Sequence, residues 1–157
     1  MAHVPPNIER FNLTALRLFN DLYDAFPNAI DIDTAVLGAE AAPEELPAPD
    51  ALAYAMGADE VVTWLAEEGF IRVAGGNLGT EINGVRLTLK GLTVLGYIPT
   101  VLKPNEASEP MIDKIKRTLG SGAEKAGAEA VKALLGGVFK LAISYASSGG
   151  SSPGISV

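Results

Sequence analysis

The side chains that could carry acid, base or metal chemistry are few and far apart in this sequence. His3 is the only histidine and the chain has no cysteine, which excludes a histidine-based triad, a multi-histidine metal site and thiolate ligands. The carboxylate pairs, Glu44 with Glu45 and Glu67 with Glu68, are sequence neighbours, and neighbours on a helix point about 100° apart. These pairs are therefore typical of a solvated surface rather than of a general acid and base.

Two further patterns could bind ligands. Asp31 and Asp33 stand two residues apart, but the glycine and the further carboxylates of a calcium loop are missing, which favours helix capping or solvation. Residues 75–79 are rich in glycine, yet they lie between two expected strands and lack the helix N-terminus that cradles phosphate. We therefore expect no catalytic residue, no metal ligand and no cofactor site, and hence a protein that is not an enzyme.

The first half of the chain shows clear helix and strand signals. Apolar residues recur at helical spacing over residues 7–26 and predict a helix of about five turns. A short strand is expected over residues 29–33, where apolar and acidic residues alternate, and a helix capped by Asp33 or Thr34 should follow. Residues 40–50 contain three prolines and four acidic residues, a composition that is typical of a loop.

The next predicted helix begins at Asp59, its N-cap, and ends near Glu68, with Gly69 following the C-cap. A helical segment over residues 51–56 either joins this helix or is separated from it by a turn at Gly57. The sequence leaves both arrangements open.

A β-hairpin and a short helix are expected after Gly69. Residues 70–73 and 85–89 alternate in polarity and predict two strands. Residues 74–84 between them are rich in turn-forming residues and should form the tip of the hairpin. Thr88 is placed to cap a helix that Pro99 ends.

The run VVTWLAEEGFI, followed by VRLTLKGLTVLG, resembles the winged helix-turn-helix superfamily over roughly residues 7–99. The motifs that carry the resemblance, LxxxGFI and LTxKG, are packing and turn signals. The resemblance implies that the helix over 59–68 enters the major groove of DNA and that the hairpin over 71–89 is the wing. The DNA contacts predicted under this alternative are Thr63, Arg72, Asn77, Arg86 and Lys90.

Charge is distributed unevenly along the chain. Residues 1–110 carry 6 basic and 16 acidic side chains, whereas residues 111–157 carry 6 basic and 3 acidic side chains. The helix over 59–68 contains four acidic residues and no basic residue, so a DNA phosphate backbone would be repelled by it. Composition therefore favours a protein partner over DNA.

The C-terminal part is expected to form one basic amphipathic helix over residues 111–146, broken or softened at 120–122, between a linker at 101–110 and a flexible tail at 147–157. Its run ALLGGVFKLAISYA is apolar nearly all round, so something must cover it. The chain's own surface, a second copy, a partner protein and a membrane interface are the four options. The residues expected to form this interaction helix are Ile112, Ile115, Leu119, Leu134, Val138, Leu141, Lys114, Lys125, Lys132 and Lys140.

The predicted fold class is an α-rich α+β fold with an extended lead-in over residues 1–6, a winged-helix domain over 7–100 and a long amphipathic, glycine-containing C-terminal helix. The sequence has no apolar run of about 18 residues, so we expect no membrane span. The expected location is the cytoplasm, with peripheral attachment to a membrane as the other option.

The predicted function is a non-enzymatic protein-interaction module. Its acidic winged-helix domain would meet a protein partner, and its C-terminal helix would serve self-association, partner binding or peripheral membrane attachment. The alternative is a winged-helix DNA-binding transcriptional regulator in which the C-terminal helix forms a dimer.

Overall fold

The computed structural model describes residues 4–96, 109–121 and 127–151. Over these ranges the chain is mostly helical and has one small antiparallel sheet, so the α-rich α+β class is confirmed. The elements in chain order are α1 (Pro6–Ala25), β1 (Ile30–Asp33), α2 (Thr34–Ala41), α3 (Ala48–Glu67), β2 (Ile71–Val73), β3 (Asn77–Leu78), β4 (Glu81–Leu87), α4 (Leu89–Gly96), α5 (Met111–Ser121) and α7 (Ala128–Ser151).

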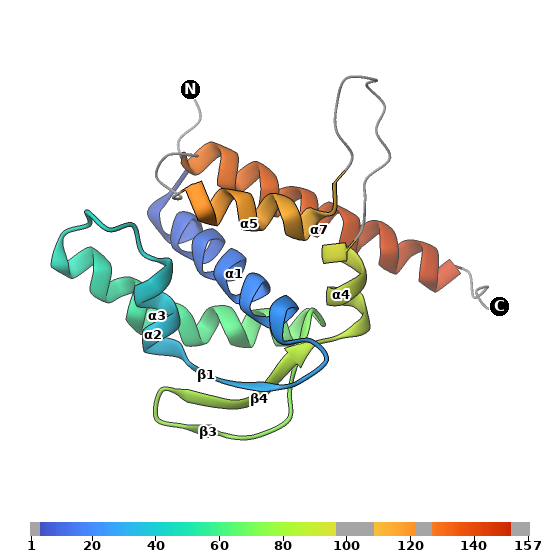
Figure 1. Cartoon of the computed structure of the whole chain (residues 1–157), viewed down its shortest axis with the longest axis horizontal. Helices are drawn as coiled ribbons and strands as arrows, with labels where there is room; N and C mark the ends of the chain where they lie inside the picture. Colours follow the sequence, from blue (N-terminus) through green and yellow to red (C-terminus); the bar gives the residue numbers. More distant parts are fainter. Residues whose placement is uncertain (1–3, 97–108, 122–126, 152–157) are drawn as a thin grey trace.

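Helix α1 is the element on which the other helices pack. It contacts α2, α3, α5 and α7, and Leu16, Leu18 and Phe19 are fully buried along it. In Figure 1 helices α5 and α7 lie on one side of α1, and the sheet lies on the other. The five-turn helix that the apolar spacing predicts is thus confirmed.

Strand β4 is the centre of the sheet. The strands β1 and β2 both pair with it in antiparallel fashion, which gives the order β1-β4-β2. The hairpin is confirmed, but its tip is more regular than the sequence predicts, because Asn77 and Leu78 pair with the start of β4. Gly79, with φ of 62°, allows the tight turn that makes this pairing possible.

The two aspartates of β1 accept hydrogen bonds, Asp33 from the start of α2 and Asp31 from within the sheet. One carboxylate oxygen of Asp33 accepts hydrogen bonds from the backbone N–H groups of Ala35 (3.0 Å) and Val36 (3.2 Å), and so caps α2. Asp31 accepts a hydrogen bond of 3.0 Å from the backbone N–H of Gly84 on β4. The predicted capping role is confirmed.

Helix α3 corrects two predictions. It runs without interruption from Ala48, so Asp59 is an interior residue and the prediction that it caps the helix is wrong. The loop predicted over 40–50 is also too long, because α2 extends to Ala41 and α3 begins at Ala48. Pro49 is tolerated because the N–H groups of a helix's first turn have no intrahelical partner.

Helix α4 begins as the sequence predicts. The hydroxyl oxygen of Thr88 accepts a hydrogen bond of 3.1 Å from the backbone N–H of Gly91. The same hydroxyl lies 2.6 Å from the carbonyl oxygen of Gly69, so one side chain caps α4 and ties it to the end of α3. Pro99, the predicted end of this helix, lies outside the described residues.

The C-terminal helix expected over 111–146 is two helices, α5 and α7, which run in opposite directions (Figure 1). Both join the main core, to which α7 contributes Val131, Leu135 and Val138. The buried face of α7 therefore differs from the one expected for a single continuous helix. Ala130 and Ala133, which that helix would place on its apolar face, are exposed. Because α7 continues to Ser151, the first part of the predicted tail at 147–157 is helical.

Of the four options for covering the apolar C-terminal run, the chain's own surface is the one that the structure shows for its buried residues. Ile115 of α5 and Val138 of α7 have no exposed surface. Among the described helices, none has the length and hydropathy of a membrane-spanning segment.

Candidate functional site

A groove of about 760 Å³ lies between the N-terminal half of α1 and the outer face of α3, and α7 contributes one residue, Phe139, to it. We call it the α1–α3 groove. Its lining residues include Ile8, Arg10 and Phe11 of α1, Tyr54, Gly57, Glu60, Val61, Thr63, Trp64 and Glu67 of α3, and Phe139.

Helical spacing explains why α3 presents these residues together. Tyr54, Gly57, Val61 and Trp64 are three or four residues apart, so they form one stripe along the helix. Gly57 leaves the middle of the stripe open, because a Cβ atom built there would have no neighbouring heavy atom within 4 Å. The uninterrupted course of α3 is therefore what places Tyr54 in line with Trp64.

Trp64 is the aromatic centre of the groove. Its side chain remains 41% exposed, although its ring contacts Phe11 edge-on at 5.2 Å and Phe139 at 5.6 Å between centroids. Phe139 in turn lies 5.4 Å from Phe70, and Phe70 lies 5.8 Å from Phe19 in the core. A continuous series of ring contacts thus connects the surface groove to the centre of the molecule, which holds the exposed indole in place.

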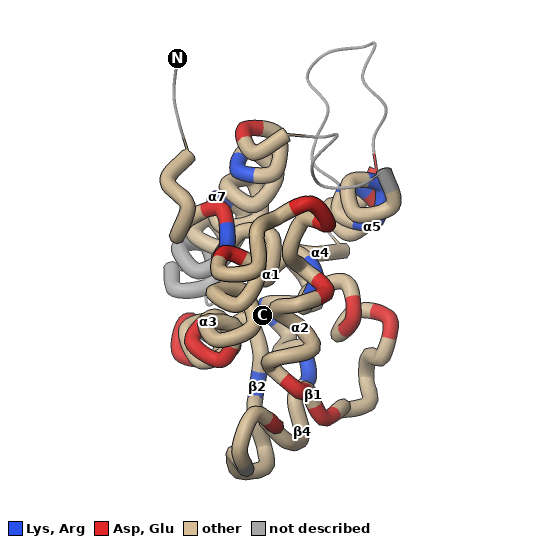
Figure 2. Tube along the Cα trace, turned by 90° about the vertical axis from the view of Figure 1, so that its left-hand side faces the viewer, with Lys and Arg blue, Asp and Glu red and all other residues tan. Residues whose placement is uncertain are grey.

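The α3 wall of the groove is acidic. Glu60 and Glu67 line it, and Ala48–Glu67 includes four acidic residues and no basic residue. Figure 2 shows this acidic stretch of α3 at the surface. Arg10 on the α1 wall supplies the positive charge on the opposite side.

Tyr54 adds a polar group at the base of the stripe. Its burial raises the pKa of the phenol to about 12, and the nearby carboxylate of Glu9 acts in the same direction. Like any phenol at neutral pH, the hydroxyl is protonated and can donate a hydrogen bond.

The structure separates the residues predicted for the interaction helix into two groups. Ile112, Ile115 and Val138 are buried in the chain's own core, and Leu119 is partly buried against it. The three buried residues cannot meet a partner in this conformation. A second groove of about 530 Å³ between α5 and α7 contains Leu134, Leu141, Lys114 and Lys140, Lys132 is exposed on α7, and Lys125 lies outside the described residues.

Four of the five residues predicted to contact DNA are spread over three places. Thr63 lines the α1–α3 groove, and Asn77 lies in the short strand β3. Arg72 and Arg86 occupy directly opposite positions on β2 and β4.

Lys90, the fifth of these residues, already has interaction partners within the fold. Its ammonium donates a hydrogen bond of 2.8 Å to the carbonyl oxygen of Glu68, and it lies 4.8 Å from the ring centroid of Phe70. It therefore supports the end of α3 rather than projecting freely.

The sequence did not identify Phe11, Tyr54 and Phe139 as residues of a binding site. Phe11 belongs to an apolar stripe that the spacing assigns to the core, and a long helix is required to align Tyr54 with Trp64. Phe139 follows the buried Val138, and successive residues on a helix face different directions. That succession of apolar residues was the one available signal that α7 has a second contact face.

The described residues contain no group of three His, Cys, Asp or Glu side chains arranged to hold a metal ion. Comparison with known proteins finds no family model that matches the chain, no matching curated protein and no matching solved structure. The fold and the site therefore define a class in physical terms alone: an α-rich α+β domain with an aromatic surface groove that has one acidic wall.

Proposed function

We propose that the chain is a non-enzymatic protein-interaction module whose α1–α3 groove receives the apolar face of a basic amphipathic helix from a partner protein. The observation that carries this proposal is the position of Trp64, which is 41% exposed inside the groove and supported by Phe11 and Phe139. Tryptophan in a preformed apolar pocket is a frequent energetic centre of protein interfaces.

The free energy available from Trp64 is large for one side chain. Its exposed part amounts to about 100 Å² of a side chain that buries up to ~250 Å² in total. Covering that area with apolar groups would contribute about 2.5 kcal/mol before the entropy of association is subtracted.

The dimensions of the groove favour a helix as the occupant. The stripe from Tyr54 to Trp64 is roughly 15 Å long, which corresponds to about three turns of an α-helix. A helical partner would place apolar residues at positions i, i+3 or i+4, and i+7 along it. Helix α7 takes part in this function because it supplies Phe139.

The acidic residues of the groove determine which kind of partner helix would bind. Glu60 and Glu67 would lie close to the bound helix. Lysine or arginine on the flank of that helix would be attracted to them, and acidic residues would be repelled. The expected partner segment is therefore apolar on one face and basic beside it.

The proposal is tested with two labelled synthetic helices of about 14 residues, one built from leucine and lysine and the other from leucine and glutamate. The full-length chain should bind the leucine–lysine helix in a saturable way, as measured by fluorescence anisotropy. Trp64→Ala should weaken binding at least tenfold, and Glu60→Gln with Glu67→Gln should weaken it most at low salt. The exposed residue Lys132 provides the control, because Lys132→Ala should have no effect.

Two results would reject this function: equal binding of the leucine–glutamate helix, or an affinity that Trp64→Ala leaves unchanged. If the test succeeds, a photo-crosslinker at Thr63 can capture the natural partner. Its capture counts in favour only if Trp64→Ala abolishes it.

A second candidate function is a winged-helix DNA-binding transcriptional regulator. The order of helix, hairpin and helix from α3 to α4 supports it, as does the exposed pair Arg72 and Arg86. It requires a mobility shift with generic duplex DNA at low salt that weakens steeply as salt rises. The absence of a shift at low salt would eliminate it.

A further inference from the structure

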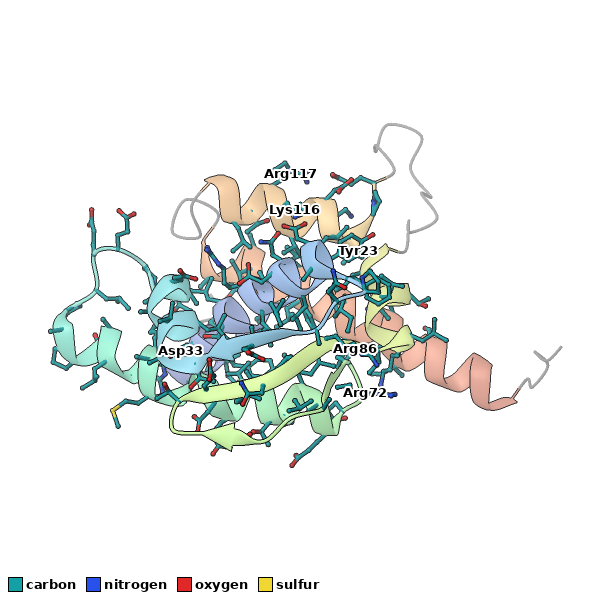
Figure 3. The ribbon with its side chains drawn as sticks, turned by 60° about the horizontal axis from the view of Figure 1, so that its bottom comes forward. Tyr23, Asp33, Arg72, Arg86, Lys116 and Arg117 are labelled. Atoms are coloured by element: carbon teal, nitrogen blue, oxygen red, sulfur yellow. The ribbon has the colours of Figure 1, made fainter. Side chains whose placement is uncertain are left out.

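Arg72 and Arg86 form a cross-strand pair of like charge. They are directly opposite in the β2–β4 register, and both are exposed. Opposite residues of an antiparallel pair project from the same face of the sheet. Figure 3 shows the two side chains beside each other at the end of the sheet nearest α4.

This pairing is unfavourable without an anion. Like charges at directly opposite positions destabilise an antiparallel pair. Within the described parts of the chain, neither guanidinium has an ion-pair partner, although acidic residues outnumber basic ones by 19 to 12 in the sequence. The fold thus places two arginines side by side and leaves both able to bind an anion.

A pocket of about 270 Å³ adjoins the pair. Arg72 and Arg86 line it together with Phe26 and Pro27, which follow α1, and with Leu89 and Leu92 of α4. Leu89 is 70% exposed, and Phe26 is also exposed. The pocket therefore offers two fork-shaped cation groups next to an apolar surface.

We propose that this pocket binds an acidic segment of a partner protein in which a glutamate or aspartate stands beside an apolar side chain. Two guanidinium groups suit a carboxylate, because each guanidinium can donate a pair of hydrogen bonds to the carboxylate oxygens. The neighbouring phenyl, proline and leucine groups would cover the apolar side chain.

A nucleic-acid backbone fits this pocket less well. DNA carries one phosphate per about 1.7 Å of helix axis, and its binding requires a row of cations. Lys90, in the first turn of α4, is already engaged with Glu68 and Phe70. Apolar walls would also have no counterpart on a phosphate backbone.

This second site is separate from the α1–α3 groove and does not depend on the function proposed for it. The groove uses α1 up to Thr14, whereas the pocket begins at Phe26, after the end of the helix. A rise of 1.5 Å per residue separates these positions by roughly 18 Å. Each site can therefore be removed without the other.

The test uses the full-length chain and two matched peptides, acetyl-Leu-Glu-Leu-amide and acetyl-Leu-Gln-Leu-amide. The glutamate peptide should shift the NMR signals of the Arg72 and Arg86 Nε–H groups to saturation. Arg72→Gln or Arg86→Gln should each weaken its binding at least tenfold. Lys132→Gln and Trp64→Ala, which lie outside the pocket, should leave its affinity unchanged.

Parallel titrations with inorganic phosphate and with a short DNA duplex identify the competing ligands. The proposal is overturned if the glutamine peptide binds as well as the glutamate peptide, or if neither arginine substitution weakens binding. It is also overturned if phosphate or the duplex saturates the two arginine signals at a lower concentration than the glutamate peptide does. Unchanged binding of the leucine–lysine helix to Arg72→Gln would show that a failure here leaves the function of the groove intact.

Discussion

The indole ring of Trp64 on α3 and the phenyl ring of Phe139 on α7 lie 5.6 Å apart between centroids, at an interplanar angle of 61°. Phe139 also lies 5.4 Å from Phe70, which is buried directly before β2. Because Phe139 touches both rings, this one side chain of α7 contacts the core and the surface groove at the same time. The groove is complete only when the C-terminal helix is docked.

Phe139→Ala should therefore lower both stability and affinity for a groove ligand. The ring is only partly buried but contacts three other aromatic rings, so we expect a loss of about 2–4 kcal/mol in the free energy of unfolding. Urea unfolding followed by the fluorescence of Trp64, the only tryptophan, measures it. Lys140→Ala, at the next position, should change it by no more than about 0.5 kcal/mol. Equal effects of the two substitutions would contradict the anchoring role.

Apolar burial should hold α5 in place more strongly than its ion pair does. Ile115 has no exposed surface, and Ile115→Ala should cost about 2–4 kcal/mol. The ammonium of Lys116 lies 2.6 Å from Asp24 and 2.8 Å from Asn20, but this pair is partly exposed, so Lys116→Ala should cost less than about 1 kcal/mol. Urea unfolding of both variants compares them directly. A larger cost for Lys116→Ala would show that the ion pair, not the core, positions α5.

Local sequence signals were sufficient to predict several of the helices and strands. The apolar period of α1 predicts its length, and the caps at Asp33 and Thr88 are correct because a cap depends on hydrogen bonds within a few residues. The fold class follows from the same signals, since α+β composition is the sum of the elements.

Long-range contacts explain what the sequence could not predict. The start of α3 was missed because prolines at 47 and 49 indicate a loop locally, while packing of α2 against α3 favours a longer helix. The groove could not be predicted either. Its centre depends on a contact between Trp64 and Phe139. This contact forms only because α7 folds back onto the rest of the chain.

Two glycines should respond to alanine in opposite directions. A Cβ atom at Gly38 would overlap the backbone carbonyl of Tyr54, so Gly38→Ala should force α2 away from α3 and cost about 2 kcal/mol or more. Gly57 lies inside α3 with open space around it, so Gly57→Ala should raise stability by about 0.5–1 kcal/mol through helix propensity. Thermal unfolding by circular dichroism distinguishes the two. A destabilising Gly57→Ala would mean that α3 bends at this glycine in solution.

Tyr54 should make stability depend on alkaline pH. Its pKa is raised from 10.0 to about 12 in the folded chain, chiefly by burial and then by Glu9, so folding favours the protonated phenol. The resulting stability is fully present below pH 10 and is lost as the pH rises toward 12. Relative to Tyr54→Phe, which has no hydroxyl to titrate, the wild-type chain should lose roughly 1 kcal/mol in the free energy of unfolding between pH 8 and pH 11. Urea unfolding at the two pH values measures this difference, and Glu9→Gln should make it smaller because one cause of the shift is removed. A difference between wild type and Tyr54→Phe that stays constant over this range would place the hydroxyl in water, and the stripe from Tyr54 to Trp64 would then be more open than the structure has it.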